Sequence, residues 1–119
     1  MGLVERLTTG FGGEPIASRD LGFVDAKASS VDVTVGGREY TVHQSPAMLS
    51  STRAGGTTGA VLWTAARLFA DYLASPRNAV VALLPPRPSV LELGCGVSPL
   101  AALALRPVAA SYVLSDQPY

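Results

Sequence analysis

The stretch of residues 89–116 constrains the fold of this chain more than any other part of its sequence. A short apolar run at residues 90–93 is typical of a buried strand, and two glycines separated by one residue follow it. Residues 98–105 then predict a helix with Ser98 at its N-cap, and residues 111–114 predict a second strand. A strand, a helix and a strand in this order form a right-handed crossover with parallel strands, so the predicted fold class is α/β.

The glycine turn and the acidic residues near it predict a cofactor site at the carboxyl ends of these strands. Gly94 and Gly96 have no Cβ, so the backbone can contact a ligand there, and the helix that begins at Ser98 directs N–H groups to the same place. Asp116 lies twenty residues beyond Gly96, about the spacing of a carboxylate that binds ribose hydroxyls. Glu92 adds a negative charge, which disfavours a diphosphate and favours a cationic ligand.

A dinucleotide-dependent oxidoreductase is the alternative for a site of this kind. Its G-x-G-x-x-G turn requires a third glycine at position 99, where this chain has Pro99. No basic residue stands close to the turn to pair with a diphosphate. The acidic residue before the first glycine instead favours S-adenosyl-L-methionine, whose amino group and sulfonium are positively charged.

The rest of the chain predicts a β-hairpin and one long helix. Residues 31–43 alternate between apolar and polar side chains on both sides of Gly36 and Gly37, which is a strong hairpin signal. Residues 57–75 carry apolar side chains at helical spacing over more than half of the helix circumference. Residues 1–30 are rich in small residues without a sustained period, and we expect them to be a flexible leader.

The composition limits the partners of the chain. Lys plus Arg equals Asp plus Glu, nine each, so nothing steers the chain toward nucleic acid or an anionic membrane. One cysteine allows no internal disulfide, and no apolar run approaches the roughly 18 residues of a membrane span. The first residues lack the apolar core of a signal peptide, so we expect a cytoplasmic protein, with the nucleus also possible.

Three motifs together resemble a known family. The stretches "TTGAVLWTAARLFADYL", "VLELGCG" and "YVLSDQP" are similar to those of the seven-β-strand (class I) S-adenosylmethionine-dependent protein-lysine methyltransferases. Within that family the chain is most similar to the fungal branch that methylates ribosomal proteins. The hairpin "VDVTVGGREYTVHQSP" matches this branch too, so the resemblance covers residues 31–119.

The resemblance implies the N-terminal part of a Rossmann-like class I methyltransferase fold with an incomplete sheet. Residues 31–119 would form a partial methyltransferase domain, with residues 89–119 as its cofactor-binding half. The implied activity is lysine N-methylation of a ribosomal or translation-related protein. The family's substrate-binding half is not found in the sequence, so we expect the chain to be inactive alone and name no catalytic residue and no metal ligand. A charged fraction of 15%, against about 25% in typical domains, is consistent with faces that another part would cover.

The resemblance also assigns the cofactor site. It places Trp63 near the cofactor, the turn at Gly94, Cys95 and Gly96, and the ribose-binding carboxylate at Asp116. The family usually has a third glycine at position 98, where this chain has Ser98. Ordinary structural alternatives remain open, since Trp63 on an apolar helix can be a core residue and Cys95 can simply fill the turn.

A second reading of function is a non-catalytic cofactor-binding or interaction half-domain. In that case the missing C-terminal half would be its partner. The sequence leaves open the substrate protein, the target lysine and the oligomeric state.

Overall fold

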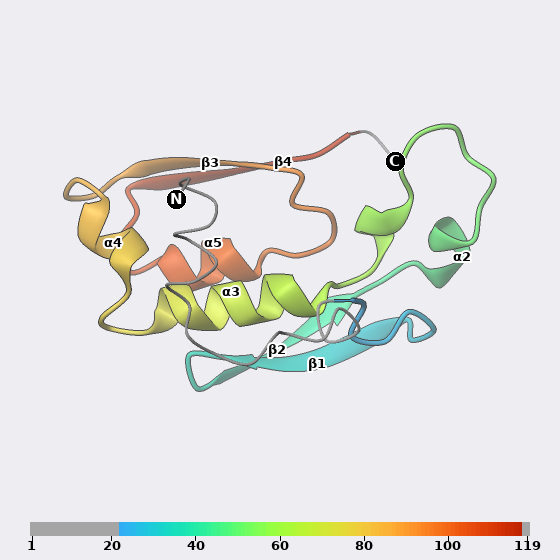
Figure 1. The fold of residues 1–119 in the computed structure, drawn as a ribbon, viewed down its shortest axis with the longest axis horizontal. Helices are drawn as coiled ribbons and strands as arrows, with labels where there is room; N and C mark the ends of the chain where they lie inside the picture. Colours follow the sequence, from blue (N-terminus) through green and yellow to red (C-terminus); the bar gives the residue numbers. More distant parts are fainter. Residues whose placement is uncertain (1–21, 118–119) are drawn as a thin grey trace, which may run out of the picture.

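The computed structural model describes residues 22–117. The chain forms two small sheets with helices between them (Figure 1). A hairpin lies on one side of helices α3 and α5, and a parallel pair of strands lies on the other side. The elements are, in chain order, β1 (Ser30–Val35), β2 (Arg38–His43), α2 (Pro46–Leu49), the 3-10 helix η2 (Thr58–Ala60), α3 (Thr64–Ala74), α4 (Ala79–Leu83), β3 (Ser89–Leu93), α5 (Leu100–Leu105) and β4 (Ser111–Ser115).

Strands β1 and β2 form an antiparallel hairpin in the range where the sequence predicts one. Every second residue of β1 is buried, because side chains of a strand alternate between its two faces. Gly36 and Gly37 connect the strands with φ angles of 57° and 78°, the left-handed values that a tight two-residue hairpin turn requires. The Gly36 N–H donates to Oδ1 of Asp71 at 2.9 Å, and this bond attaches the hairpin to α3.

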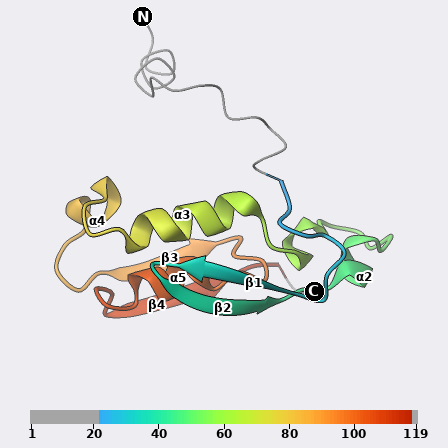
Figure 2. The ribbon, with the colours of Figure 1, turned by 90° about the horizontal axis from the view of Figure 1, so that it is seen from below.

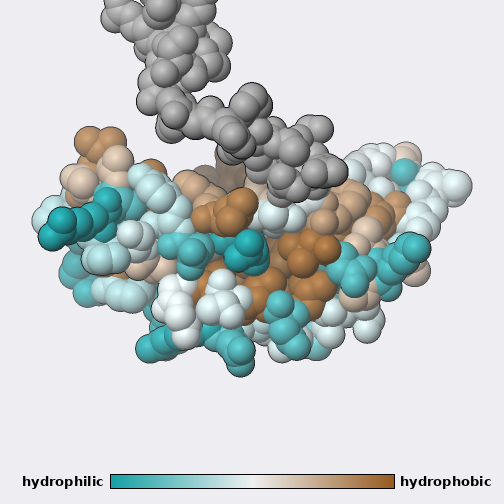
Figure 3. All heavy atoms as spheres, turned by 60° about the horizontal axis from the view of Figure 1, so that its bottom comes forward, coloured by the Kyte–Doolittle hydropathy of each residue, from teal (hydrophilic) through white to brown (hydrophobic). Residues whose placement is uncertain are grey.

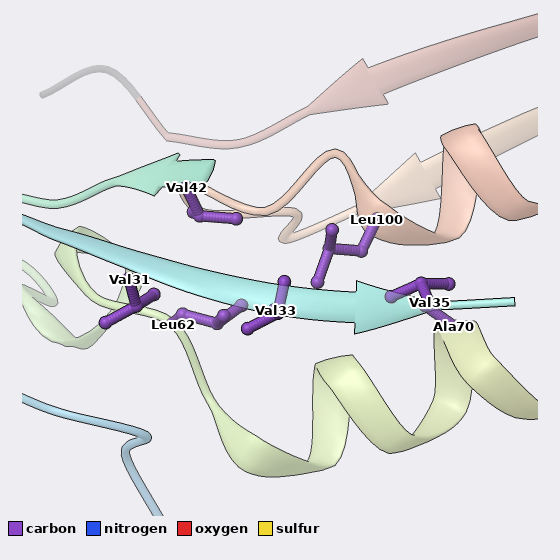
Figure 4. Close-up of a cluster of buried hydrophobic side chains, with 7 residues drawn as sticks. All are labelled: Val31, Val33, Val35, Val42, Leu62, Ala70 and Leu100. Carbon is purple, nitrogen blue, oxygen red and sulfur yellow. The ribbon is translucent and has the colours of Figure 1, made fainter. Parts of the chain in front are cut away.

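The hydrophobic core lies between the hairpin and the helices. Figure 4 shows the valines of the hairpin together with Leu62 from the segment before α3, Ala70 from α3 and Leu100 from α5. The cluster consists of Val31, Val33, Val35, Val42, Leu62, Ala70 and Leu100. Leu62, Ala70 and Leu100 are completely buried, so the hairpin is an integral part of the folded unit.

Strands β3 and β4 are parallel and are joined by α5, which confirms the predicted α/β class. Each of the two sheets has two strands within residues 22–117, so the observed sheets are small. Leu91, Leu93 and Val113 lie on one face of the parallel pair and are 62%, 76% and 56% exposed. Parallel sheets are normally covered on both faces, and here one face carries exposed apolar side chains.

Apolar surface also occurs elsewhere on the molecule. In the space-filling view of Figure 3, hydrophobic residues lie among the hydrophilic ones on the face turned toward the reader. In the described part of the chain, no helix combines the length and the apolar character that crossing a membrane requires.

The helix predicted for residues 57–75 is wrong at its start. The structure has a short 3-10 helix, η2, then extended residues, and α3 begins only at Thr64. Tertiary hydrogen bonds explain the difference, because the Leu62 N–H donates to Oε1 of Gln44 and the Leu62 carbonyl accepts from Val24 N–H. These bonds use backbone groups that a continuous helix would need for itself.

The predicted leader, residues 1–30, lies largely outside the described residues. Its end, from residue 22, runs alongside the start of α3 (Figure 2). Phe23 pairs with Trp63 in an isolated antiparallel bridge, and Thr64 N–H donates to the Gly22 carbonyl. The division into a leader and a domain at residue 31 stays a prediction.

The hairpin turn generates a stability prediction. A Cβ at Gly36 would lie 2.8 Å from the Cβ of Ala74, whereas a Cβ at Gly37 meets no atom within 4 Å. Both positions have positive φ, so Gly37→Ala should lower the free energy of unfolding by about 1–2 kcal/mol through backbone strain alone. Gly36→Ala should lower it by about 2–4 kcal/mol, because the collision adds to that strain.

Chemical denaturation of both variants checks this expectation. The two substitutions are chemically identical and one residue apart, so each is the control for the other. Equal losses of stability would show that the contact with Ala74 does not constrain the turn.

Candidate functional site

A cleft of about 610 Å³ lies at the carboxyl ends of β3 and β4, next to η2 and the start of α3. Its volume is in the range of small-molecule sites. The structure brings together all six residues that the sequence predicts for a cofactor site, from three separate segments of the chain. These six predicted residues, which line the cleft together with others, are Trp63, Glu92, Gly94, Cys95, Gly96 and Asp116. What they bind stays a prediction at this point.

The turn between β3 and α5 is held by hydrogen bonds within the protein. The N–H groups of Gly94 and Cys95 both donate to the carbonyl of Ser115, at 2.8 and 3.1 Å. The Gly96 N–H donates to Oδ2 of Asp116, across twenty residues of sequence. The turn after the first strand is therefore attached to the end of the second strand.

Gly96 also allows a close approach of two backbone segments. A Cβ at this position would lie 2.8 Å from the carbonyl oxygen of Gly59, and its φ is 57°. The neighbouring Val97 N–H donates to the same oxygen at 3.0 Å. The sequence predicts that this glycine brings the backbone to a ligand, but in the structure the contact it permits is with η2.

The predicted helix start at Ser98 is also corrected. α5 begins at Leu100 with Pro99 at its N-cap, and the Ser98 N–H donates to the Cys95 carbonyl at 3.1 Å. The Ser98 hydroxyl accepts only a long bond, 3.4 Å, from the Leu100 N–H. The N–H of Ser98 therefore closes the turn, whereas the sequence predicts that it points to a ligand.

Glu92 and Tyr112 form a hydrogen-bonded pair in the cleft. Val90 lies opposite Tyr112 in the parallel register, so their side chains point to the same face of the pair. Glu92 is two residues after Val90 and therefore also points to that face, where Glu92 and Tyr112 both line the cleft. The Tyr112 hydroxyl donates to Oε1 of Glu92. Burial, this hydrogen bond and the negative charge of Glu92 raise the pKa of Tyr112 above its ordinary value, so the hydroxyl keeps its proton at neutral pH.

The thiol of Cys95 responds to the same negative charges. Burial raises the pKa of Cys95 first, and the charges of Glu92 and Asp116 raise it further. A raised pKa keeps the thiol protonated, so Cys95 is a poor nucleophile. This agrees with the interpretation that Cys95 fills the turn.

Trp63 forms an aromatic wall of the cleft. Its indole N–H donates to the Thr58 carbonyl at 3.0 Å, and its ring meets that of Phe23 edge to face at 4.8 Å. These contacts fix the ring while 40% of the residue stays exposed. Trp63 is therefore both a packed residue and part of the cleft surface, so the two alternatives of the sequence analysis are compatible.

Among the cleft residues that sequence reasoning missed are Phe69, Tyr112 and Gln117. Tyr112 could have been found from the parallel register, which places it diagonal to Glu92 on one face. The Gln117 amide donates to the Gly56 carbonyl at 2.7 Å, a contact over 61 residues for which the sequence contains no signal.

Comparisons with known proteins find similarity to a protein of a different kind from the family that the motifs suggest. No protein-family model matches the chain, and no solved structure matches it. The chain is similar to a curated protein named diaminohydroxyphosphoribosylamino-pyrimidine deaminase, from Schizosaccharomyces pombe, with 37% identity over 98 residues. The match covers 82% of this chain and 24% of the relative, so the chain spans about a quarter of that protein's length.

This relative is a deaminase, and it contradicts the resemblance to protein-lysine methyltransferases. The predicted methyl transfer and S-adenosyl-L-methionine as the cofactor are therefore wrong. The alternative, a non-catalytic half-domain, receives no support from the match either. Glycine turns followed by an acidic residue occur with many ligands, which is why the motifs alone misled the assignment.

The residues of this chain do not fit a deaminase zinc centre. Zinc-dependent nucleobase deaminases hold the metal with one His and two Cys, or with three Cys. This sequence has one His and one Cys. Within residues 22–117, no three His, Cys, Asp or Glu side chains lie together in a group that could hold a metal ion.

The field of the two carboxylates generates a prediction for the thiol. Glu92→Gln removes one negative charge beside Cys95, so the pKa of the thiol should fall and the pH midpoint of its alkylation by iodoacetamide should shift downward. Cys95 is the single cysteine, so the reaction reports on this site alone.

Glu39→Gln, on β2 and outside the cleft, changes the net charge equally and should leave the midpoint in place. A wild-type midpoint below that of free cysteine would contradict the expected pKa direction.

Proposed function

We propose that this chain is part of a deaminase of an amino-substituted pyrimidine and that its cleft binds the heterocycle. The similarity to the fission-yeast deaminase is the observation that carries this proposal. The cleft supports it, because hydrogen-bond acceptors and aromatic rings meet there and its volume suits a nucleoside-sized ligand.

The acceptors of the cleft are matched to amino groups. A carboxylate accepts hydrogen bonds from the exocyclic amine of a pyrimidine, and such charge-assisted bonds are stronger than those between neutral groups. Glu92 and Asp116 both line the cleft. Oε1 of Glu92 and both oxygens of Asp116 already accept bonds within the protein, but a carboxylate oxygen has two lone pairs and can accept a second bond from a ligand. Trp63 and Phe69 offer ring surfaces on which a heterocycle can stack.

Binding the pyrimidine and activating water would then be tasks of different parts of the enzyme. The residues of this chain cannot build the His and Cys ligand set of a nucleobase deaminase, as shown above. We derive no step of the reaction through a metal from this chain.

The binding proposal predicts a preference for an amino group. Cytidine should bind in the cleft and change the fluorescence of Trp63, which is the single tryptophan of the chain. Uridine has a carbonyl in place of the amine, and this oxygen would face the carboxylates. We therefore expect it to bind about tenfold or more weakly, the equivalent of one lost charge-assisted hydrogen bond.

Glu92→Gln should reduce the preference for cytidine, and Glu39→Gln should retain it. Fluorescence titration of the full chain with cytidine and with uridine measures the affinities for the wild type and both variants. Absence of saturable cytidine binding by folded protein, confirmed by circular dichroism, would contradict the proposed function.

The donor set predicts that the purified chain contains well below one zinc ion per molecule. Mass spectrometry of metals measures this content directly. Treatment with EDTA should leave the midpoint of thermal unfolding unchanged, because a structural metal would otherwise add to stability. A stoichiometric, chelator-sensitive zinc would overturn the separation of binding and metal chemistry.

We further propose that β3 and β4, joined by α5, belong to a larger Rossmann-like sheet. The parallel pairing and the bare apolar face with Leu91, Leu93 and Val113 support this, because parallel strands are usually buried on both faces. Replacing Leu91 and Leu93 by serine should then reduce the binding of a hydrophobic dye and self-association of the isolated chain. A large loss of stability in that variant would instead indicate that these leucines pack within the chain.

A further inference from the structure

The N–H groups of the glycine turn are occupied by partners within the protein. Gly94 and Cys95 donate to the Ser115 carbonyl, Gly96 to Asp116, Val97 to the Gly59 carbonyl and Ser98 to the Cys95 carbonyl. These are all the residues from the end of β3 to Pro99, which has no N–H. Phosphate-binding turns donate hydrogen bonds from such N–H groups to the anion, whereas in this turn the N–H groups already donate to acceptors within the protein.

The first N–H group of α5 also has an acceptor within the protein. The helix has six residues, and its N-cap is Pro99. The first N–H of the helix, that of Leu100, is directed to the Ser98 hydroxyl. The N–H groups of residues 94–98 and that of Leu100 therefore already have acceptors within the protein.

The charges of the cleft also disfavour an anionic group. Glu92 and Asp116 are both carboxylates, and among the described lining residues there is no Lys, Arg or His. Burial raises the pKa of Cys95 first, and the negative charges of both carboxylates raise it further. A phosphate carries up to two negative charges and would have to enter beside these two carboxylates, and none of the described lining residues is a cation that could pair with it.

We propose that the cleft binds its ligand at the nucleoside level and discriminates against a phosphate ester of the same ligand. This rests on the proposed function, namely binding of an amino-substituted pyrimidine. A ligand without a phosphate differs from the phosphoribosyl compound that the name of the fission-yeast relative contains. The discriminating residues are Glu92 and Asp116, which repel the phosphate while they accept hydrogen bonds from neutral donors.

The test compares cytidine with cytidine monophosphate on the wild-type full chain, with Trp63 fluorescence as the signal. We expect the monophosphate to bind about tenfold or more weakly at low ionic strength. The difference should shrink as salt is added, because ions screen the repulsion but would not relieve a steric exclusion.

Two substitutions identify the source of the discrimination. Asp116→Asn keeps an oxygen that can accept from the Gly96 N–H but removes the charge, and Glu92→Gln does the same for the bond from Tyr112. Each should reduce the ratio between the two affinities. Glu39→Gln alters the net charge equally from outside the cleft and should leave that ratio unchanged.

The outcomes separate this inference from the proposed function. Tight cytidine binding with weak, salt-sensitive monophosphate binding supports both. Monophosphate binding as tight as that of cytidine overturns the discrimination and leaves the pyrimidine site standing. If neither compound binds to folded protein, the proposed function fails and the discrimination fails with it.

Discussion

The hydrogen bond from Gly96 to Asp116 is the interaction on which the arrangement of the cleft depends. It joins the turn after β3 to the end of β4, while the adjacent Val97 joins the same turn to Gly59 in η2. Three segments far apart in sequence therefore meet around one glycine, which has room for no Cβ. The contacts that shape the cleft also occupy the N–H groups of the turn, so the charged groups that remain in the described lining are the carboxylates of Glu92 and Asp116.

The hairpin and the cleft are connected through α3. One side of this helix contributes Ala70 to the core under the hairpin valines, while its N-cap Trp63 and its residue Phe69 line the cleft. Asp71 receives the N–H of Gly36 from the hairpin turn. Packing of the hairpin therefore holds the helix that supplies the aromatic surface, although the hairpin itself lies away from the cleft.

A glycine turn with a carboxylate after the next strand is a geometric solution that several ligand classes share. In this chain it suggested a methyltransferase and S-adenosylmethionine, and the similarity to a deaminase overturned both. The motif specifies a crossover whose strand ends meet, because that geometry needs glycines and a capping carboxylate for its own stability. The chemistry of a ligand depends on which groups remain available after these bonds are made, and a motif does not contain that information.

Local patterns in the sequence determined the hairpin, the parallel crossover and the gathering of Glu92, Cys95 and Asp116 at one end of the strands, because these follow from side-chain alternation and turn chemistry. Tertiary structure decided the late start of α3, since Gln44 and Val24 bind the backbone of Leu62 that a helix would otherwise use. It also decided that Ser98 closes a turn, that Tyr112 pairs with Glu92 and that Gln117 reaches Gly56. Hydrogen bonds between distant segments outweigh local propensity wherever the segments are buried together, and the sequence around each residue does not reveal its distant partner.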